Sequence, residues 1–231
     1  MIALADCNNF FASCERSIRP ELEGKPIVVL SNNDGCIIAR SNEAKALGYK
    51  MGEPVFKVKD KLLRDRVHMF SGNMTLYRDI SEKIMDILSS ECNAIEVYSI
   101  DEAFMDFTSV AAAEEKAELL RMQVLQETKI PISIGIAKTK VLAKLASHIA
   151  KKHSRKGVFK LHNKDLIERA LSYYSVEELW GVGRKQTQFL NDKGIFQASQ
   201  LAQANEAWLR RHMSVLGVRM ARELKGIPCF E

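Results

Sequence analysis

The chain has little of what stabilises extracellular proteins or anchors membrane proteins. Only five of its 231 residues are cysteines, an odd number at irregular spacings, with no CxxC pair and no Cys/His pair at zinc spacing. Disulfides and structural zinc are therefore not expected, and reduced thiols suit a reducing compartment. No apolar run approaches the roughly 20 residues of a membrane span. The N-terminus meets an acid at Asp6 without a preceding basic segment. We expect a cytoplasmic protein with no membrane contact.

One stretch of the chain also lacks acids. Residues 138–164 contain no Asp or Glu but nine Lys or Arg, and the whole chain has a net charge of +5. Taking these nine charges away leaves −4 for the rest, so the positive charge is local. A local basic block favours contact with a polyanion, and a solvated lysine-rich helix is an equally good explanation. The nine residues are Lys138, Lys140, Lys144, Lys151, Lys152, Arg155, Lys156, Lys160 and Lys164.

The pattern of apolar residues predicts an α+β fold. With 46% hydrophobic and 27% charged residues, the composition is that of an ordinary globular protein. Strands and helices alternate up to about residue 163, and short helices with glycine turns follow, so we expect helices packed on a mixed β-sheet and then an all-helical unit. The helix at 140–152 is expected to turn its lysines outward. The expected strands are 1–6, the two arms around the Asn-Asn-Asp-Gly turn at 32–35, 66–70, 96–100, 103–107, 130–138 and 156–161; the expected helices are 8–18, 42–49, 52–63, 74–91, 111–129 and 140–152.

The stretch SIDEAFMDF, residues 99–107, places Asp101 and Glu102 side by side among strand-forming residues. Neighbours on a regular strand point to opposite faces, so both acids reach one target only from the bend of a hairpin. Asp6 ends the first strand, and if that strand is adjacent, three carboxylates meet at one end of the sheet. Such a cluster needs a cation, and oxygen ligands favour Mg²⁺ or Mn²⁺. Two such ions suit phosphoryl transfer.

A plainer interpretation of these acids stays open. In it, Asp101 caps a turn and Glu102 is an ordinary surface acid. Asp106 lies on the outgoing strand among aromatic residues, and we expect it to be structural.

Five motifs, taken in order, resemble those of the Y-family translesion DNA polymerases, most closely the UmuC-like branch. They are ADCNNFFASCE at 5–15, IARSNEAKALG at 38–48, YSIDEAFMDF at 98–107, SIGIAKTKVLAKLAS at 133–147 and LWGVGRKQ at 179–186. The resemblance covers essentially the whole chain. It implies a palm with a mixed sheet at 1–25 and 70–163, a small fingers subdomain at 26–69, and an all-helical thumb with a helix–hairpin–helix at 164–231.

The resemblance implies error-prone DNA synthesis by two-metal nucleotidyl transfer from a dNTP to a primer 3′-OH, in DNA repair and the SOS response. Asp6, Asp101 and Glu102 match the catalytic, metal-binding carboxylates of the family, and the backbone carbonyl of Cys7 matches its main-chain ligand. The implied cofactors are two Mg²⁺ ions, with Mn²⁺ as an alternative. The implied partners are primer–template DNA and dNTP, together with a UmuD-like dimer and a RecA-like filament.

The resemblance also implies a nucleotide site. Phe11 falls where the family places an aromatic steric gate, whose ring would crowd a ribose 2′-OH. Core packing is the alternative for Phe11 and the preferred interpretation of Phe10. Lys45 and Lys151 match triphosphate-contacting cations, which would stabilise departing pyrophosphate, with surface solvation as the alternative. The candidate nucleotide-binding residues are Phe10, Phe11, Arg40, Ser41, Lys45 and Lys151.

The stretch LWGVGRKQTQFL resembles the hairpin of a helix–hairpin–helix module. Gly181 and Gly183 would let backbone N–H groups approach a DNA phosphate, and Arg184 and Lys185 would add positive charge at the same edge. A Gly-x-Gly sequence is also common in ordinary turns, so this motif depends on the others for its interpretation.

The most important departure from the family is at the end of the sequence, near the linker after which the family continues into a little-finger domain. We therefore expect either a fragment or a naturally shortened product without that domain. Fewer phosphate contacts weaken DNA binding, and binding through such contacts falls with salt. A catalytically weak DNA-binding remnant is therefore a second hypothesis. A palm-type nucleotidyl cyclase or related phosphotransferase is a third, and the thumb-like hairpin argues against it.

Overall fold

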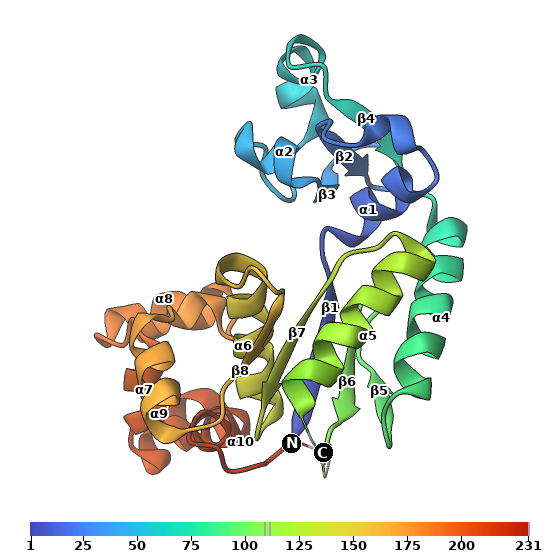
Figure 1. The fold of residues 1–231 in the computed structure, drawn as a ribbon. Helices are drawn as coiled ribbons and strands as arrows, with labels where there is room; N and C mark the ends of the chain where they lie inside the picture. Colours follow the sequence, from blue (N-terminus) through green and yellow to red (C-terminus); the bar gives the residue numbers. More distant parts are fainter. Residues whose placement is uncertain (109, 111, 231) are drawn as a thin grey trace.

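The computed structural model describes residues 1–108, 110 and 112–230, and its elements form three groups (Figure 1). A five-stranded sheet lies in the centre, a three-stranded sheet with short helices lies above it, and a group of helices lies to one side. Residues 111 and 231, at the ends of the helix predicted at 111–129 and of the predicted thumb, lie outside the described residues.

The central sheet has the strand order β5-β6-β1-β7-β8. β7 and β8 are parallel, and the other neighbouring pairs are antiparallel. The predicted mixed sheet and α+β class are therefore confirmed. The strands are β1 (Ile2–Cys7), β5 (Ile95–Val97), β6 (Glu102–Asp106), β7 (Ile132–Ala137) and β8 (Val158–Lys160).

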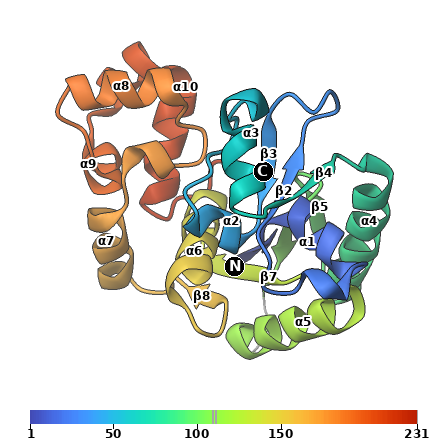
Figure 2. The same cartoon turned by 90° about the horizontal axis from the view of Figure 1, so that it is seen from above.

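Helices cover both faces of this sheet, as Figures 1 and 2 show: α4 (Met74–Ser90) and α5 (Ala113–Thr128) on one, α6 (Lys140–His153) on the other. The alternation along β1 decides which side chains meet them. Ala3, Ala5 and Cys7 join the core under α4 and α5, whereas Leu4 joins the core under α6. Asp6 is two residues beyond Leu4, so it faces the α6 side.

α6 lies unusually close to β7, and a glycine permits this. A Cβ atom on Gly135 would lie 2.0 Å from the backbone nitrogen of Ser147 and 2.3 Å from the carbonyl oxygen of Ala143. Any side chain at this position would therefore push α6 off the sheet. The approach matters for the site because α6 carries lysines toward the strand ends.

The smaller sheet has the order β3-β2-β4 and a core of its own around Val28, Ile37 and Leu62. The antiparallel β2–β3 pair is the hairpin predicted from Asn-Asn-Asp-Gly. β4 ends at Ser71, two residues past the predicted boundary between fingers and palm. The elements of this group are α1 (Phe10–Ser17), η1 (Pro20–Leu22), β2 (Ile27–Leu30), β3 (Ile37–Arg40), α2 (Asn42–Ala46), α3 (Val55–Arg64) and β4 (His68–Ser71).

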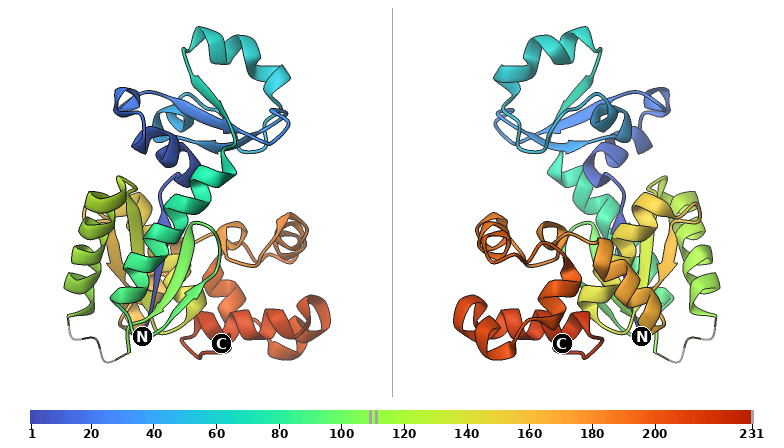
Figure 3. Two further views of the ribbon diagram at one scale, coloured as in Figure 1. Left: turned by 90° about the vertical axis from the view of Figure 1, so that its right-hand side faces the viewer. Right: turned by 90° about the vertical axis from the view of Figure 1, so that its left-hand side faces the viewer.

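The chain after residue 163 is helical, as predicted, and it packs on the outer side of α6 (Figure 3). Glu223, fully buried, ties the two together: its carbonyl accepts a hydrogen bond from Thr139 Oγ1 at 2.9 Å, and its carboxylate accepts one from the Val141 N–H at 3.1 Å. The elements are α7 (Lys164–Tyr173), η2 (Val176–Glu178), α8 (Arg184–Asp192), α9 (Ala198–Gln203) and α10 (Glu206–Leu224), which is kinked at Ser214.

All five cysteines lie in the described part of the chain and are free thiols. Burial, reinforced by the charges of Asp101 and Asp6, raises the pKa of the Cys7 thiol well above its usual value. Across residues 1–108, 110 and 112–230, no helix has both the length and the apolar character needed to cross a membrane.

Candidate active site

The three predicted carboxylates lie together at one end of the central sheet. The antiparallel register of β1 and β6 sets Asp6 directly opposite Glu102, so their Cβ atoms are about 5 Å apart on the same face. Asp101 precedes Glu102 at the bend of the predicted hairpin, where the Tyr98 N–H donates to the Glu102 carbonyl at 3.0 Å. The Cys7 N–H donates to the Asp101 carbonyl at 2.9 Å, which joins β1 to the bend.

Each carboxylate nevertheless has a partner of its own. Lys151 Nζ lies 2.8 Å from Asp6 Oδ1, Lys144 Nζ donates to Glu102 Oε2, and Ser99 Oγ donates to Asp101 Oδ1 at 2.6 Å. Among the described residues, no group of three or more His, Cys, Asp or Glu side chains is arranged to hold a metal ion. The acids are therefore neighbours whose side chains are directed to separate partners.

Burial dominates the electrostatics of Glu102. It raises the pKa of this carboxyl group, and the nearby charges of Asp6 and Asp101 raise it further, whereas Lys144 acts in the opposite direction. Lys144 thus offsets part of the cost of burying a carboxylate beside two others.

The expectation that the helix at 140–152 turns its lysines outward is wrong for the residues that matter here. The side chains of Lys140 and Lys144 are only 8% and 24% exposed, because they reach back to acids on the hairpin. More widely, seven of the nine residues of the basic block form ion pairs among the described residues. These are Lys140, Lys144, Lys151, Lys152, Lys156, Lys160 and Lys164.

A cavity of about 350 Å³ opens beside the carboxylates, between the central sheet and the smaller sheet. It brings seven of the predicted site residues together, whereas Asp6, Glu102 and Ser41 do not line it. Asp6 is connected to this cavity by its ion pair with Lys151, which lines it. The lining residues are Cys7, Asn9, Phe10, Phe11, Ile38, Ala39, Arg40, Lys45, Met51, Ile100, Asp101 and Lys151.

The two adjacent phenylalanines have different surroundings. Phe10 is 4% exposed and belongs to the main core, although one part of it reaches the cavity. Phe11 is half-buried, and its ring stacks on Tyr77 with centroids 4.5 Å apart and an interplanar angle of 17°. Tyr77 is itself held, because its hydroxyl donates to Glu15 Oε1 at 2.7 Å. The Phe11 ring is therefore fixed at the cavity wall.

The cations of the cavity are crowded. Burial lowers the pKa of Lys45, and the positive charges of Lys151 and Arg40 lower it further, while Asp6 raises it. Arg40 donates to the Tyr49 carbonyl through Nη1 at 2.6 Å, but its buried Nε is without a hydrogen-bond partner among the described residues. A buried donor of this kind is costly and marks a place for an acceptor.

Sequence reasoning missed Asn9. This residue has a left-handed backbone with φ 51°, a conformation that asparagine tolerates better than most residues. Its side chain links the segment after β1 to helix α2, because Asn9 Oδ1 accepts from Lys45 and Asn9 Nδ2 donates to Asn42 Oδ1 at 2.9 Å. The Asn-Asn pair before the helix was visible in the sequence, but its partners were not.

Ser41 has a structural place. It is 1% exposed, and its hydroxyl oxygen accepts from the Ile27 N–H at 3.0 Å and, as the N-cap of α2, from the Ala44 N–H at 3.3 Å. These bonds fix the start of the helix that carries Lys45.

The candidate DNA-binding hairpin lies between η2 and α8, far along the chain from the carboxylates. Gly181 has φ +85°, which favours glycine, and Gly183 is the N-cap of α8. Arg184 and Lys185 occupy the first turn of α8, are exposed, and form no ion pair within the described residues. This edge differs from the basic block, whose charges are mostly paired.

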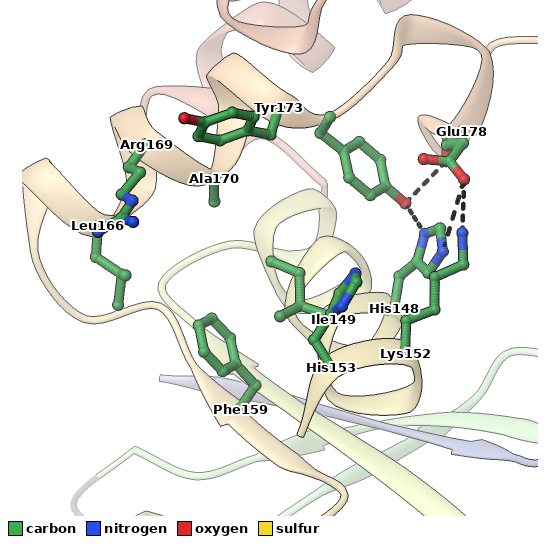
Figure 4. Close-up of a pocket in the computed structure, with 11 residues that line it drawn as sticks. His148, Ile149, Lys152, His153, Phe159, Leu166, Arg169, Ala170, Tyr173 and Glu178 are labelled. Atoms are coloured by element: carbon green, nitrogen blue, oxygen red, sulfur yellow. Dashed lines mark hydrogen bonds and ion pairs between the residues drawn. The ribbon is translucent and has the colours of Figure 1, made fainter. Parts of the chain in front are cut away.

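A larger cavity, of about 550 Å³, lies between α6, β8 and α7, and no predicted site residue lines it (Figure 4). At one end Glu178 lies 2.9 Å from Lys152 and 3.7 Å from His148, which also contacts the Tyr174 hydroxyl. Burial, together with Lys152, lowers the pKa of His148. The contacts fasten the helical unit to α6.

Comparison with known proteins shows the family of the chain. Residues 5–148 match the model of the impB/mucB/samB family. The chain is 47% identical over 236 residues to protein UmuC of Salmonella typhimurium, covering 100% of this chain and 56% of that protein. It is 32% identical over 228 residues to DNA polymerase IV 1 of Halalkalibacterium halodurans, covering 96% and 54%. The chain thus spans about half the length of these relatives.

Solved structures show the same arrangement of elements. The insertion ternary complex of Dbh DNA polymerase matches with a TM-score of 0.82 and 27% identity, covering 97% of this chain and 68% of that one. DinB from Sulfolobus solfataricus matches with a TM-score of 0.80 and 28% identity, covering 97% and 66%. The family model alone spans more than half of the chain. The chain belongs to the impB/mucB/samB family and has the fold of the Y-family DNA polymerases.

Proposed function

We propose that the chain carries out template-directed DNA synthesis of the error-prone translesion type, in DNA repair and the SOS response. The observation that carries the proposal is the cavity beside the carboxylates, because it combines an acidic floor at Asp101, a fixed aromatic wall at Phe11 and cations at Lys45 and Lys151. A deoxynucleoside triphosphate offers a matching polyanionic end and sugar. Relatives named UmuC and DNA polymerase IV support the same reaction.

Asp6, Asp101 and Glu102, with the carbonyl of Cys7, would hold two Mg²⁺ ions, or Mn²⁺ in their place. The donor set fits, since it consists of oxygens with high negative charge at one end of the sheet. Ions held there would supply Lewis-acid chemistry, lowering the pKa of a primer 3′-OH and balancing the charge of pyrophosphate. We assign no side chain as general base.

The cavity cations would hold the triphosphate. Lys45 and Lys151 supply two ammonium groups, and Arg40 Nε, which has no hydrogen-bond partner in the described part of the chain, supplies a buried donor. The lowered pKa of Lys45 supports this, because the crowding by Lys151 and Arg40 that contributes to it would be relieved by an anion. Asn9 holds Lys45 in place between the two sheets.

Phe11 would select the deoxy sugar. Its stack on Tyr77 keeps the ring from moving aside, so a ribose 2′-OH would meet an immobile aromatic face. Phe10, buried in the core, would act mainly by supporting α1.

The hairpin of Gly181 and Gly183, with Arg184 and Lys185, would hold the primer–template backbone through N–H groups and positive charge. We assign the palm to residues 1–25 and 70–163, the fingers to 26–69 and the thumb to 164–231. A UmuD-like dimer, a RecA-like filament and a cytoplasmic location belong to the same proposal and rest on the family relation alone.

Primer extension tests the proposal most simply. The chain is incubated with an undamaged primer–template, Mg²⁺ and dNTPs at low salt, beside an Asp101→Ala variant whose folding is checked by circular dichroism. Addition of one nucleotide by the parent and none by the variant is expected. No incorporation by a folded parent that binds DNA would contradict the proposal and leave a DNA-binding remnant.

A further inference from the structure

Helix α6 delivers two ammonium groups to the carboxylate site. Lys144 and Lys151 are seven residues apart, which is about two helical turns, so they project from one face of the helix. Lys144 meets Glu102 and Lys151 meets Asp6, the two acids that β1 and β6 place opposite each other. The close approach of α6 to β7 at Gly135 makes both contacts possible.

The Lys144–Glu102 pair is the more enclosed of the two. The side chains are 24% and 15% exposed, against 30% and 18% for Lys151 and Asp6. A carboxylate this well buried beside two others is costly without a counter-charge. Lys144 supplies that charge, and in doing so it occupies Oε2 of Glu102, one of the two oxygens that this carboxylate offers to a divalent ion.

The pairing also explains why the acids do not converge. Asp6 and Glu102 are set opposite each other by the strand register, yet within the described ranges the acids form no metal-holding group. Their side chains are drawn toward lysines on α6 instead of toward a common point. A ligand set would form only if Glu102 exchanged its ammonium partner for the ion.

We propose that Lys144 is a resident counter-ion of the carboxylate site, which neutralises Glu102 in the metal-free protein and gives up its place when a divalent cation binds. The inference rests on the proposed function, since it takes the carboxylates as the metal site. Lys144 is then a positioning residue that weakens metal binding in exchange for a stable metal-free fold. Lys151 is less suitable for the test because it is also a candidate triphosphate contact.

Manganese binding tests the exchange directly. Chelator-treated protein is titrated with Mn²⁺, and free Mn²⁺ is followed by electron paramagnetic resonance. Lys144→Met is expected to tighten the Kd by about tenfold, the factor that loss of a charged hydrogen bond supports. Lys140→Met is the matched control: it removes the same charge one turn earlier on α6, where Lys140 lies 2.5 Å from Glu96. The Kd of Lys140→Met for Mn²⁺ should remain within about twofold of the parent value.

Thermal unfolding is a second measurement on the same proteins. Without metal, Lys144→Met should unfold at a lower temperature than the parent, and saturating Mn²⁺ should remove most of the difference. If Lys144→Met does not fold at all, Lys144→Arg serves instead. Its guanidinium should grip the carboxylate of Glu102 more firmly and weaken Mn²⁺ binding.

The outcomes separate this inference from the proposed function. Unchanged Kd values in Lys144→Met and Lys144→Arg, with Mn²⁺ binding abolished in Glu102→Gln, would overturn the counter-ion and leave the metal site intact. Mn²⁺ binding that is unchanged in Glu102→Gln and in Asp101→Ala would overturn both the counter-ion and the proposed metal site. Equal tightening in Lys140→Met and Lys144→Met would also overturn the counter-ion, because general charge would then explain it.

Discussion

The two basic parts of this molecule use their charge in opposite ways. On α6, lysines are partly buried and paired with acids of the same chain, as Lys144 is with Glu102. At the hairpin before α8, Arg184 and Lys185 are exposed and form no ion pair among the described residues. The count of positive charges is much higher in the first region, yet the second has the charges that an external polyanion can reach.

The comparison teaches that a basic block in a sequence is not in itself a nucleic-acid surface. Acids brought in by the fold, such as Glu96 and Glu178, neutralise most of the block. In the proposed function, the charges at the α6 end belong to the reaction site, and the charges at the hairpin bind DNA. Mutation and salt should therefore affect the α6 end and the hairpin before α8 differently.

The largest effect is expected at the carboxylate end. Asp6→Asn should lower single-nucleotide incorporation on the order of a thousandfold, because the proposed function makes its carboxylate a ligand of the ions. Asp106→Asn is the control on β6: this partly buried acid makes a local bond, accepting from the Thr108 N–H at 2.7 Å. Its rate should stay within about twofold of the parent. A similar loss in both variants would remove the distinction between the two acids.

The second prediction concerns Phe11, the aromatic residue beside the carboxylates, and the choice between ribose and deoxyribose. Phe11→Ala should raise incorporation of ribonucleotides relative to deoxynucleotides by roughly tenfold to a hundredfold, since the fixed ring no longer meets the 2′-OH. Competing rNTP and dNTP incorporation measures the ratio.

Phe10→Ala is the matched control for Phe11→Ala. It should lower the free energy of unfolding by about 3–5 kcal/mol, because Phe10 is a buried core residue, without changing the sugar preference. Sugar selection that moves with Phe10 and not with Phe11 would reverse the two assignments.

At the hairpin we expect a smaller, salt-dependent effect. The double variant Arg184→Ala/Lys185→Ala should weaken primer–template binding by about tenfold at moderate salt, and make the slope of log K against log salt about 1–2 less negative. Fluorescence anisotropy over a salt series gives both numbers. The pair Lys152→Ala/Lys156→Ala, in which both lysines are paired internally, should leave the slope nearly unchanged.

The smallest effect concerns the shape of the hairpin. Gly181→Ala should cost about 1–2 kcal/mol of unfolding free energy, because φ is +85° and the new Cβ would lie 3.1 Å from Met220 Cε. In Gly183→Ala the new Cβ would meet no described residue within 4 Å, so the change should cost less than about 0.5 kcal/mol. Urea denaturation compares them, and equal costs would contradict the backbone requirement at Gly181.

The sequence predicted the sheet and the meeting of the carboxylates because both depend on local patterns. Alternation in residues 2–7 and the bend at Asp101 are enough to place Asp6 opposite Glu102 once β1 and β6 pair. The predicted α+β class and the helical unit after residue 163 follow from periodicity alone.

The partners of these residues could not be predicted in the same way. Helical periodicity marks Lys144 as polar, and only the close packing of α6 at Gly135 turns it toward Glu102. Ser41 and Asn9 depend likewise on contacts with residues distant in sequence, such as Ile27 and Lys45. Such side-chain contacts are set by tertiary packing.

The central claim is that the acidic end performs the chemistry and the hairpin provides the grip. Its most direct test is the rate of single-turnover incorporation at increasing primer–template concentration, for the parent, Glu102→Gln and Arg184→Ala/Lys185→Ala. The account predicts that the hairpin variant reaches the parent rate at saturating DNA and that Glu102→Gln does not at any concentration. Recovery of Glu102→Gln at high DNA, or a hairpin variant that stays slow at saturation, would contradict it.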